Sequence, residues 1–143
     1  QTVLTDANDA LDVAAGALAV QFTAPATGAF THALGYSYSK DPSFRYCAEN
    51  LATEGSYNWW LDSCGLSGGA SGGPWVQPLT DGAGPIISVN SWGYSNQPGM
   101  AGPKLSDNSA ACRLKDAKLQ SLDTYGGKAD GQQGYIGTGA SCS

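Results

Sequence analysis

Residues 69–74 (Gly-Ala-Ser-Gly-Gly-Pro) contain the side chain best placed for chemistry, the hydroxyl of Ser71. A serine hydroxyl is an effective nucleophile only when a base removes its proton and N–H donors stabilise the oxyanion that forms on the substrate carbonyl. Neighbouring glycines let the backbone turn sharply, expose its N–H groups and leave room for a substrate chain. The same string also fits a flexible surface loop, so the residues alone leave both interpretations open.

Segments with strand character surround this loop, separated by Gly, Pro and Asp turn signals. The 20 glycines among 143 residues are about twice the usual share. We therefore expect an all-β protein with many turns. The expected strands are residues 17–22 (where a helix is the alternative), 29–38, 44–47, 58–61, 75–79 and 86–92. A helix is expected over residues 110–119, with Ser106 or Asp107 as its N-cap.

The net charge of −5 and the 13% share of charged residues argue against some classes of partner. Nucleic acids and anionic membrane surfaces attract basic patches, so we expect neither as a partner. No apolar run reaches the roughly 20 residues that cross a bilayer. Residues 1–6 lack the features of a signal peptide, so in a secreted protein the signal would have been removed before Gln1.

The four cysteines are Cys47, Cys64, Cys112 and Cys142, with no CxxC pair among them. The one histidine, His32, is distant from all four in the sequence, so no metal site is expected. An even number of widely spaced cysteines indicates disulfides and an oxidising, extracellular compartment. Spacing leaves all three connectivities open, and four buried thiols in a reducing cell are the alternative.

Three segments carry a resemblance to a known family. Residues 69–74, with Cys64 a few residues upstream, resemble the nucleophile loop of trypsin-like serine proteases of the chymotrypsin fold. Residues 91–93 (Ser-Trp-Gly), at the end of an apolar strand, resemble the segment that pairs with the substrate backbone in that family. Residues 33–36 (Ala-Leu-Gly-Tyr) resemble the strand that precedes the family's disulfide loop.

The resemblance covers about residues 15–120 and looks closest to the bacterial and fungal extracellular branches. It implies the C-terminal half of such a protease, a six-stranded antiparallel β-barrel of the two-barrel fold with a short C-terminal helix. The implied organisation is an N-terminal segment (1–14) that follows a missing first barrel, the barrel with its helix (15–122), and a Gly-rich tail (123–143).

The resemblance also implies roles for individual residues. Ser71 matches the nucleophile, and the N–H groups of Gly69 and Ser71 match the oxyanion hole. Ser91, Trp92 and Gly93 match the substrate channel. Cys47 and Cys64 fit the family's loop disulfide beside the specificity pocket, while Cys112 and Cys142 pair with each other or with cysteines outside this chain.

The sequence departs from the family pattern at two positions, which concern activation and specificity. Ala70 stands where animal members carry the aspartate that pairs with a new N-terminus, so activation by cleavage is not expected. Asp62 resembles the pocket aspartate that binds Lys or Arg in trypsins, but the stretch from Cys64 to Ser71 is longer than theirs. Asp62 is therefore either a substrate-binding residue or a solvated loop acid.

The triad of the family is incomplete in this sequence. Its order is histidine, aspartate, serine, with the first two on the N-terminal barrel. His32 falls where the family has an ordinary strand of the second barrel, so a partly exposed strand residue is the preferred interpretation. The aspartate is either among Asp6, Asp9 and Asp12 or in a segment before Gln1.

The function that follows is part of an extracellular serine endopeptidase, hydrolysing peptide bonds through an acyl-enzyme on Ser71. A separate N-terminal half would supply the histidine and aspartate, the other partner would be a peptide or protein substrate, and no cofactor is needed. The alternative is a non-catalytic protease-like domain that serves as a binding or structural component of an extracellular assembly. Whether this chain alone is an enzyme, which bond it cleaves and its natural substrate are not set by the sequence.

Overall fold

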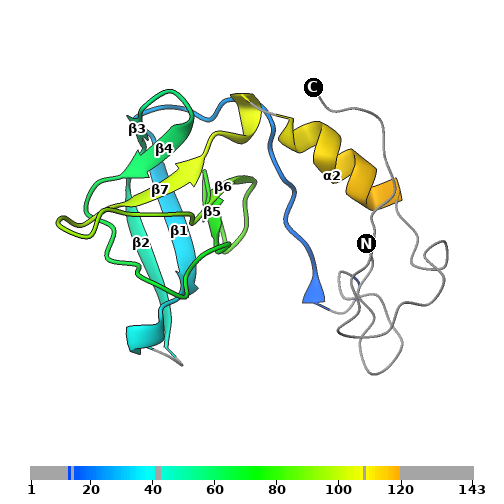
Figure 1. Ribbon diagram of the computed structural model, residues 1–143. Coiled ribbons are helices and arrows are strands. Elements are labelled where there is room, and N and C mark those ends of the chain that lie inside the picture. Colours follow the sequence, from blue (N-terminus) through cyan, green and yellow to red (C-terminus); the bar gives the residue numbers. More distant parts are fainter. Residues whose placement is uncertain (1–12, 14, 41–42, 108, 120–143) are drawn as a thin grey trace, which may run out of the picture. The chain divides into compact units, whose positions relative to one another are not determined.

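The computed structural model describes residues 13, 15–40, 43–107 and 109–119 (Figure 1). Residues 18–108 belong to one compact unit, which contains all the described strands. The helix α2 (Ala110–Leu119) belongs to a second unit and is described by itself. The expected helix over residues 110–119 is thereby confirmed, and a 3-10 helix, η2 (Leu105–Asp107), precedes it and contains Ser106 and Asp107.

A four-stranded antiparallel sheet has the order β2-β1-β5-β6. Its strands are β1 (Phe30–Tyr36), β2 (Phe44–Asn50), β5 (Pro74–Val76) and β6 (Ile86–Val89). Along β1 the residues Thr31, Ala33 and Gly35 are buried and alternate with less buried ones, the two-residue period of a strand with one face in a core. A short 3-10 turn, η1 (Tyr38–Lys40), follows β1.

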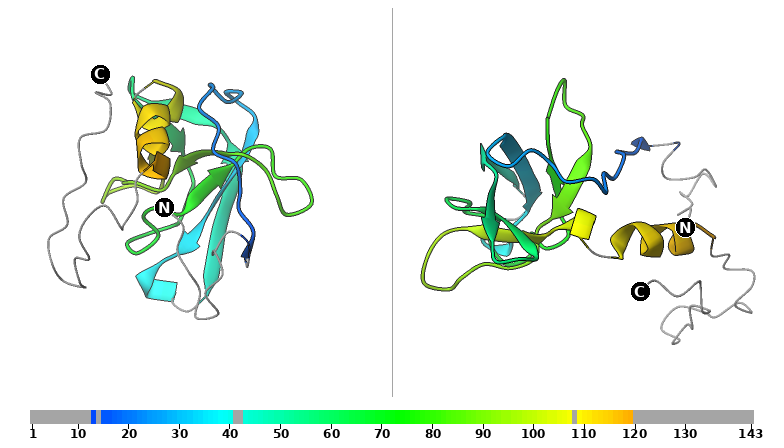
Figure 2. Two further views of the ribbon diagram at one scale, coloured as in Figure 1. Left: turned by 90° about the vertical axis from the view of Figure 1, so that its right-hand side faces the viewer. Right: turned by 90° about the horizontal axis from the view of Figure 1, so that it is seen from above.

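A three-stranded antiparallel sheet has the order β3-β4-β7. Its strands are β3 (Ala52–Glu54), β4 (Asn58–Leu61) and β7 (Met100–Pro103). The loop from β5 to β6 projects away from both sheets in the two views of Figure 2. It makes a tight hairpin at Thr80 and Ala83, whose backbones exchange two hydrogen bonds.

The chain passes from one sheet to the other at two corners. Leu51 alone separates β2 from β3, and its backbone bonds to Gly28 and Ala29, just before β1. After β6, Trp92 forms an isolated bridge with Ala101 of β7. The antiparallel β fold and its short helix confirm the expected fold class. Within the described residues, however, the strands form two sheets and not a closed six-stranded barrel, because pairing changes partner at these corners.

One hydrophobic core lies between the sheets. Trp75 and Leu61, from different sheets, are both 0% exposed. The buried residues of this cluster are Ala33, Leu51, Trp59, Leu61, Cys64, Leu66, Ala70, Trp75, Ile87 and Met100. Cys64, Leu66 and Ala70 come from the loop that carries Ser71, so the same core that joins the sheets also anchors that loop.

Sequence patterns located some strands better than others. The strand expected at 58–61 coincides with β4, whereas residues 17–22 form no strand and contribute only a bridge from Val20 to Ile86. The strands β3 and β7 were not expected from the sequence. Both are short, and β7 contains Gly102 and Pro103, residues that ordinarily weaken a strand.

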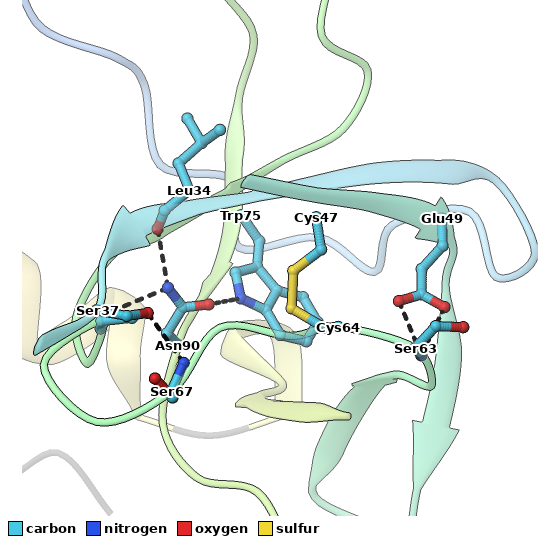
Figure 3. The surroundings of a disulfide bond; sticks show 10 residues. Leu34, Ser37, Cys47, Glu49, Ser63, Cys64, Ser67, Trp75 and Asn90 are labelled. Carbon is cyan, nitrogen blue, oxygen red and sulfur yellow. Dashed lines mark hydrogen bonds between the residues drawn. A yellow bond between two sulfur atoms is a disulfide. The ribbon is translucent and has the colours of Figure 1, made fainter. Parts of the chain in front are cut away.

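Cys47 and Cys64 form a disulfide, which confirms the expected pair (Figure 3). It joins β2 to the start of the loop that carries Ser71, across a sequence separation of 17 residues. Cys112 in α2 is also disulfide-bonded, while Cys142 lies outside the described residues.

Replacing both Cys47 and Cys64 by alanine should lower the free energy of unfolding by about 3 kcal/mol, because a closed loop of this length restricts the unfolded chain. Denaturant unfolding of this variant and of the parent chain measures the difference. An exposed Ser56→Ala substitution serves as the control and should change stability by less than about 0.5 kcal/mol. A loss below about 1 kcal/mol in the double variant would contradict a stabilising role for the bond.

Candidate functional site

The loop of residues 65–73, between β4 and β5, presents Ser71 at the surface. Gly69 and Gly72 have φ angles of +97° and +81°, values that residues with a side chain rarely adopt. A Cβ atom on Gly69 would also meet the ring and the backbone nitrogen of Tyr38. On Gly73 it would collide with the carbonyl of Leu34. Gly69, Gly72 and Gly73 are therefore required by the geometry of this loop, not only by flexibility.

The side-chain amide of Asn90 connects this loop to the core (Figure 3). Asn90 is 2% exposed and follows directly after β6. Its Nδ2 donates to the carbonyls of Leu34 (2.8 Å) and Ala70 (2.9 Å). Its Oδ1 accepts a hydrogen bond of 2.7 Å from Nε1 of the buried Trp75.

The backbone of Asn90 adds two further bonds to the same loop. Its N–H donates to the carbonyl of Gly73 at 2.8 Å, and its carbonyl accepts from the N–H of Gly72 at 2.9 Å. The two residues after Ser71, Gly72 and Gly73, are therefore bonded to the backbone of Asn90. The residue before it, Ala70, has its carbonyl bonded to the Asn90 side chain. Asn90 takes part in five hydrogen bonds, including the one that it accepts from Trp75. Together these bonds fix the path of the chain around Ser71.

The N–H groups of Gly69 and Ser71 differ from those of Ala70, Gly72 and Gly73. Those of Ala70, Gly72 and Gly73 donate to carbonyl oxygens at 2.9–3.1 Å. Within the described part of the chain, the N–H groups of Gly69 and Ser71 have no hydrogen-bond acceptor. Two exposed donors that flank a serine are the arrangement that an oxyanion hole needs.

A base for Ser71 is not found among the described residues. The Ser71 hydroxyl makes no hydrogen bond to any of them. His32 lies in the middle of β1, where its ring packs edge-on against Phe30 at a centroid distance of 5.5 Å. Its Nδ1 is buried and has no hydrogen-bond partner in the described region. The candidate aspartates Asp6, Asp9 and Asp12 lie outside the described residues.

A cavity of about 520 Å³ opens beside Ser71. Ser91, Trp92 and Gly93 form part of its wall, so the structure places these three residues next to the serine. Asp62 does not line this cavity, and its carboxylate accepts a hydrogen bond of 3.1 Å from Nε1 of Trp60. The complete lining is Cys64, Gly65, Leu66, Ser67, Gly68, Ser71, Ser91, Trp92, Gly93, Tyr94, Gln97, Pro98, Gly99 and Met100.

Aromatic rings support one side of this cavity. Trp92 and Tyr94 meet edge to face at 5.2 Å, and both pack against Trp60, at 6.1 and 5.6 Å. The Tyr94 hydroxyl donates to a carboxylate oxygen of Glu54 at 2.7 Å. This bond raises the pKa of Tyr94 above its ordinary value, because loss of the proton would place two negative charges together.

A second, smaller hollow of about 300 Å³ also has Ser71 in its lining. It is bordered by Leu34, Gly35, Tyr36 and Phe44, from β1 and β2, and by residues 69–71 and 73–74. Ser71 is the one residue that lines both hollows, so the serine lies where they meet.

Among the residues that the structure describes, no cluster of three or more His, Cys, Asp or Glu side chains is positioned to bind a metal ion. The helices described here are also too short or too polar to span a bilayer.

Comparison with known proteins relates this geometry to one family. No protein-family model matches the sequence, and no curated protein sequence matches it significantly. Two solved structures do match. The protease Anisep from Arthrobacter nicotinovorans superposes with a TM-score of 0.61 at 27% identity over 71% of this chain. The thermostable serine protease AL20 from an extremophilic microorganism gives 0.61 and 27% over 76%.

The chain has the fold of the trypsin-like serine proteases. It is a protease-like domain, and the expected resemblance is confirmed at the level of the fold. It spans about half the length of the two proteases, 48% of Anisep and 51% of AL20.

Sequence reasoning found the serine loop and the Ser-Trp-Gly segment but missed Asn90. A polar residue at the end of an apolar strand gives no sign of whether it meets solvent or core. The signal available was its position directly before residues 91–93, which line the cavity. The second hollow was missed because Tyr36 and Phe44 approach Pro74 only through sheet pairing.

Replacing Asn90 by alanine should destabilise the protein by about 4 kcal/mol, because Trp75 Nε1 and the carbonyls of Leu34 and Ala70 would be left buried without partners. Denaturant unfolding measures the loss. Hydrogen exchange should also show faster exchange of the Gly72 N–H, which reports on the loop itself.

The matched control is Ser88→Ala. Ser88 is equally buried at 0% exposure, but its hydroxyl makes a single bond of 2.8 Å, to the carbonyl of Pro103. This control should lose about 1 kcal/mol and leave the exchange of Gly72 unchanged. Equal losses in the two variants would show that the network around Asn90 has no special role.

Proposed function

We propose that this chain is the C-terminal part of an extracellular serine endopeptidase in which Ser71 is the nucleophile. The observation that carries the proposal is the pair of unpartnered N–H groups of Gly69 and Ser71, which alternate with the bonded N–H groups of Ala70 and Gly72. Donors fixed in advance of the reaction are the main source of electrostatic stabilisation in acyl transfer. A flexible surface loop would not require glycines with these φ angles and close contacts.

The chemistry that follows has two steps. The Ser71 Oγ attacks the peptide carbonyl carbon while a base takes its proton, and the carbonyl oxygen becomes an oxyanion between the two N–H donors. Collapse of this intermediate breaks the C–N bond, and the base returns the proton to the leaving amine. Water then attacks the acyl-enzyme in the same manner and releases the acid, which regenerates the serine.

Residues 91–93 have unpaired backbone groups with which a substrate chain can form hydrogen bonds. Ser91 and Trp92 are bonded to Ala101 on one side. In the described part of the chain, the carbonyl of Ser91 and both backbone groups of Gly93 have no hydrogen-bond partner. An extended peptide can add to such an edge as an antiparallel strand, which gives affinity that is independent of its sequence.

The base and its aspartate are assigned to a partner segment, the N-terminal half of the protease. This assignment is supported by the lack of a base for Ser71 among the described residues and by the coverage of about half of each related protease. An extracellular location is supported by the Cys47–Cys64 disulfide, since such bonds persist in oxidising compartments.

Labelling by a fluorophosphonate tests the proposal. In protein isolated from its natural source, Ser71 should be modified, and mass spectrometry of the tryptic peptide of residues 46–104 should locate the adduct. A Ser71→Ala variant is the control and should not be labelled. The 143-residue chain alone should react about 10²–10⁴-fold more slowly, the usual contribution of a general base.

Intact-mass analysis of the same material, before and after reduction, identifies the partner. A histidine-bearing segment, in the same polypeptide or a second one, is the expected result. Absence of both labelling and such a segment would refute the proposal. It would favour the alternative, a non-catalytic protease-like domain that binds other proteins or builds an extracellular assembly.

A further inference from the structure

The cavity beside Ser71 has no charged group in its lining. Of the described residues that form it, none is Asp, Glu, Lys, Arg or His. The lining includes the apolar side chains of Leu66, Trp92, Pro98 and Met100 and the ring of Tyr94. The polar side-chain groups are the hydroxyls of the serines and of Tyr94 and the amide of Gln97, none of which neutralises a cation.

The walls of the cavity are fixed to one another. The N–H of Gly99 donates to the carbonyl of Cys64 at 3.1 Å, which links the loop of residues 91–100 to the disulfide. A Cβ on Gly99 would overlap the ring of Trp60, and one on Gly93 would lie 2.6 Å from the Gly99 carbonyl. The segments that form the wall are therefore packed closely against one another and against Trp60.

The carboxylates of Asp62 and Glu54 are engaged outside this cavity. Asp62 accepts a hydrogen bond from Trp60 and Glu54 accepts one from Tyr94. Neither residue lines the cavity. A Lys or Arg side chain that entered would lose hydration without meeting a carboxylate, which is costly for a charged group.

We propose that this cavity binds an uncharged, large apolar side chain of the peptide, aromatic or aliphatic, and that Asp62 does not select Lys or Arg. The proposal rests on the proposed function, because it takes the bound peptide to be the substrate. The volume of about 520 Å³ is in the range of pockets that bury small ligands. The rings of Trp92 and Tyr94 offer edge and face contacts that favour an aromatic guest.

Peptide binding tests the proposal without requiring catalysis. Four amidated peptides, Ala-Ala-Pro-X with X as Phe, Leu, Lys or Arg, are titrated into the 143-residue chain. Chemical shifts of the Trp92 indole, assigned with a Trp92→Phe variant, report occupancy of the cavity. The Phe and Leu peptides should bind at least about 10-fold more tightly than the Lys and Arg peptides, because an apolar pocket discriminates to about this extent.

A charge introduced into the cavity should reverse the preference. Gly65 lines the cavity, has no positive φ, and has open space around the position of a Cβ atom. Gly65→Asp should therefore improve binding of the Lys and Arg peptides by about 10-fold, whereas the neutral control Gly65→Asn should not. Asp62→Asn and Glu54→Gln should leave the order of the four peptides unchanged.

Failure of this inference is distinguishable from failure of the proposed function. Tighter binding of Lys or Arg peptides, loss of that binding in Asp62→Asn, or no binding of any of the four peptides would overturn the inference. Absence of both fluorophosphonate labelling and a histidine-bearing segment, together with preferential binding of Phe and Leu, would overturn only the proposed function. The cavity would then be an apolar peptide-binding site in a protein that does not catalyse.

Discussion

Three buried polar groups converge on the side-chain amide of Asn90. An indole N–H from β5 and two carbonyls, one from β1 and one from the loop that carries Ser71, use its donors and acceptor at 2.7–2.9 Å. Each of these groups would be costly to bury alone, so the amide and its partners stabilise one another in a single arrangement. That arrangement fixes the loop around Ser71 relative to both the sheet and the core.

The same constraint explains the unusual density of glycine near the serine. When a loop is held by hydrogen bonds on one side and by packing against β1 on the other, its backbone lies too close to its neighbours for side chains. Gly73 lies against the Leu34 carbonyl and Gly69 against Tyr38. The N–H groups of Gly69 and Ser71 have no acceptor among the described residues. Internal bonding and exposed donors are thus two results of one packing arrangement.

The described residues supply only some of the groups that the proposed chemistry needs. The cavity wall, the exposed backbone groups of residues 91–93 and the unpartnered N–H groups of Gly69 and Ser71 all arise from residues 34–101, within the strand unit. No base for Ser71 lies among the described residues. Under the proposed function, one half of a two-barrel fold is expected to have this character, because each half contributes one wall of the cleft and different catalytic groups.

The sequence by itself determined the β class, the position of the strands β1 and β4, the helix α2, the serine loop and the Cys47–Cys64 pair that the family resemblance implied. These features depend on local patterns such as alternation, turn residues and short motifs, which neighbouring residues encode. Only the tertiary structure decided that Asn90 points into the core, that Asp62 bonds to Trp60 outside the cavity, and that β3 and β7 pair at all. Burial and partner choice depend on contacts between segments that are far apart in the chain, and local residue patterns do not specify them.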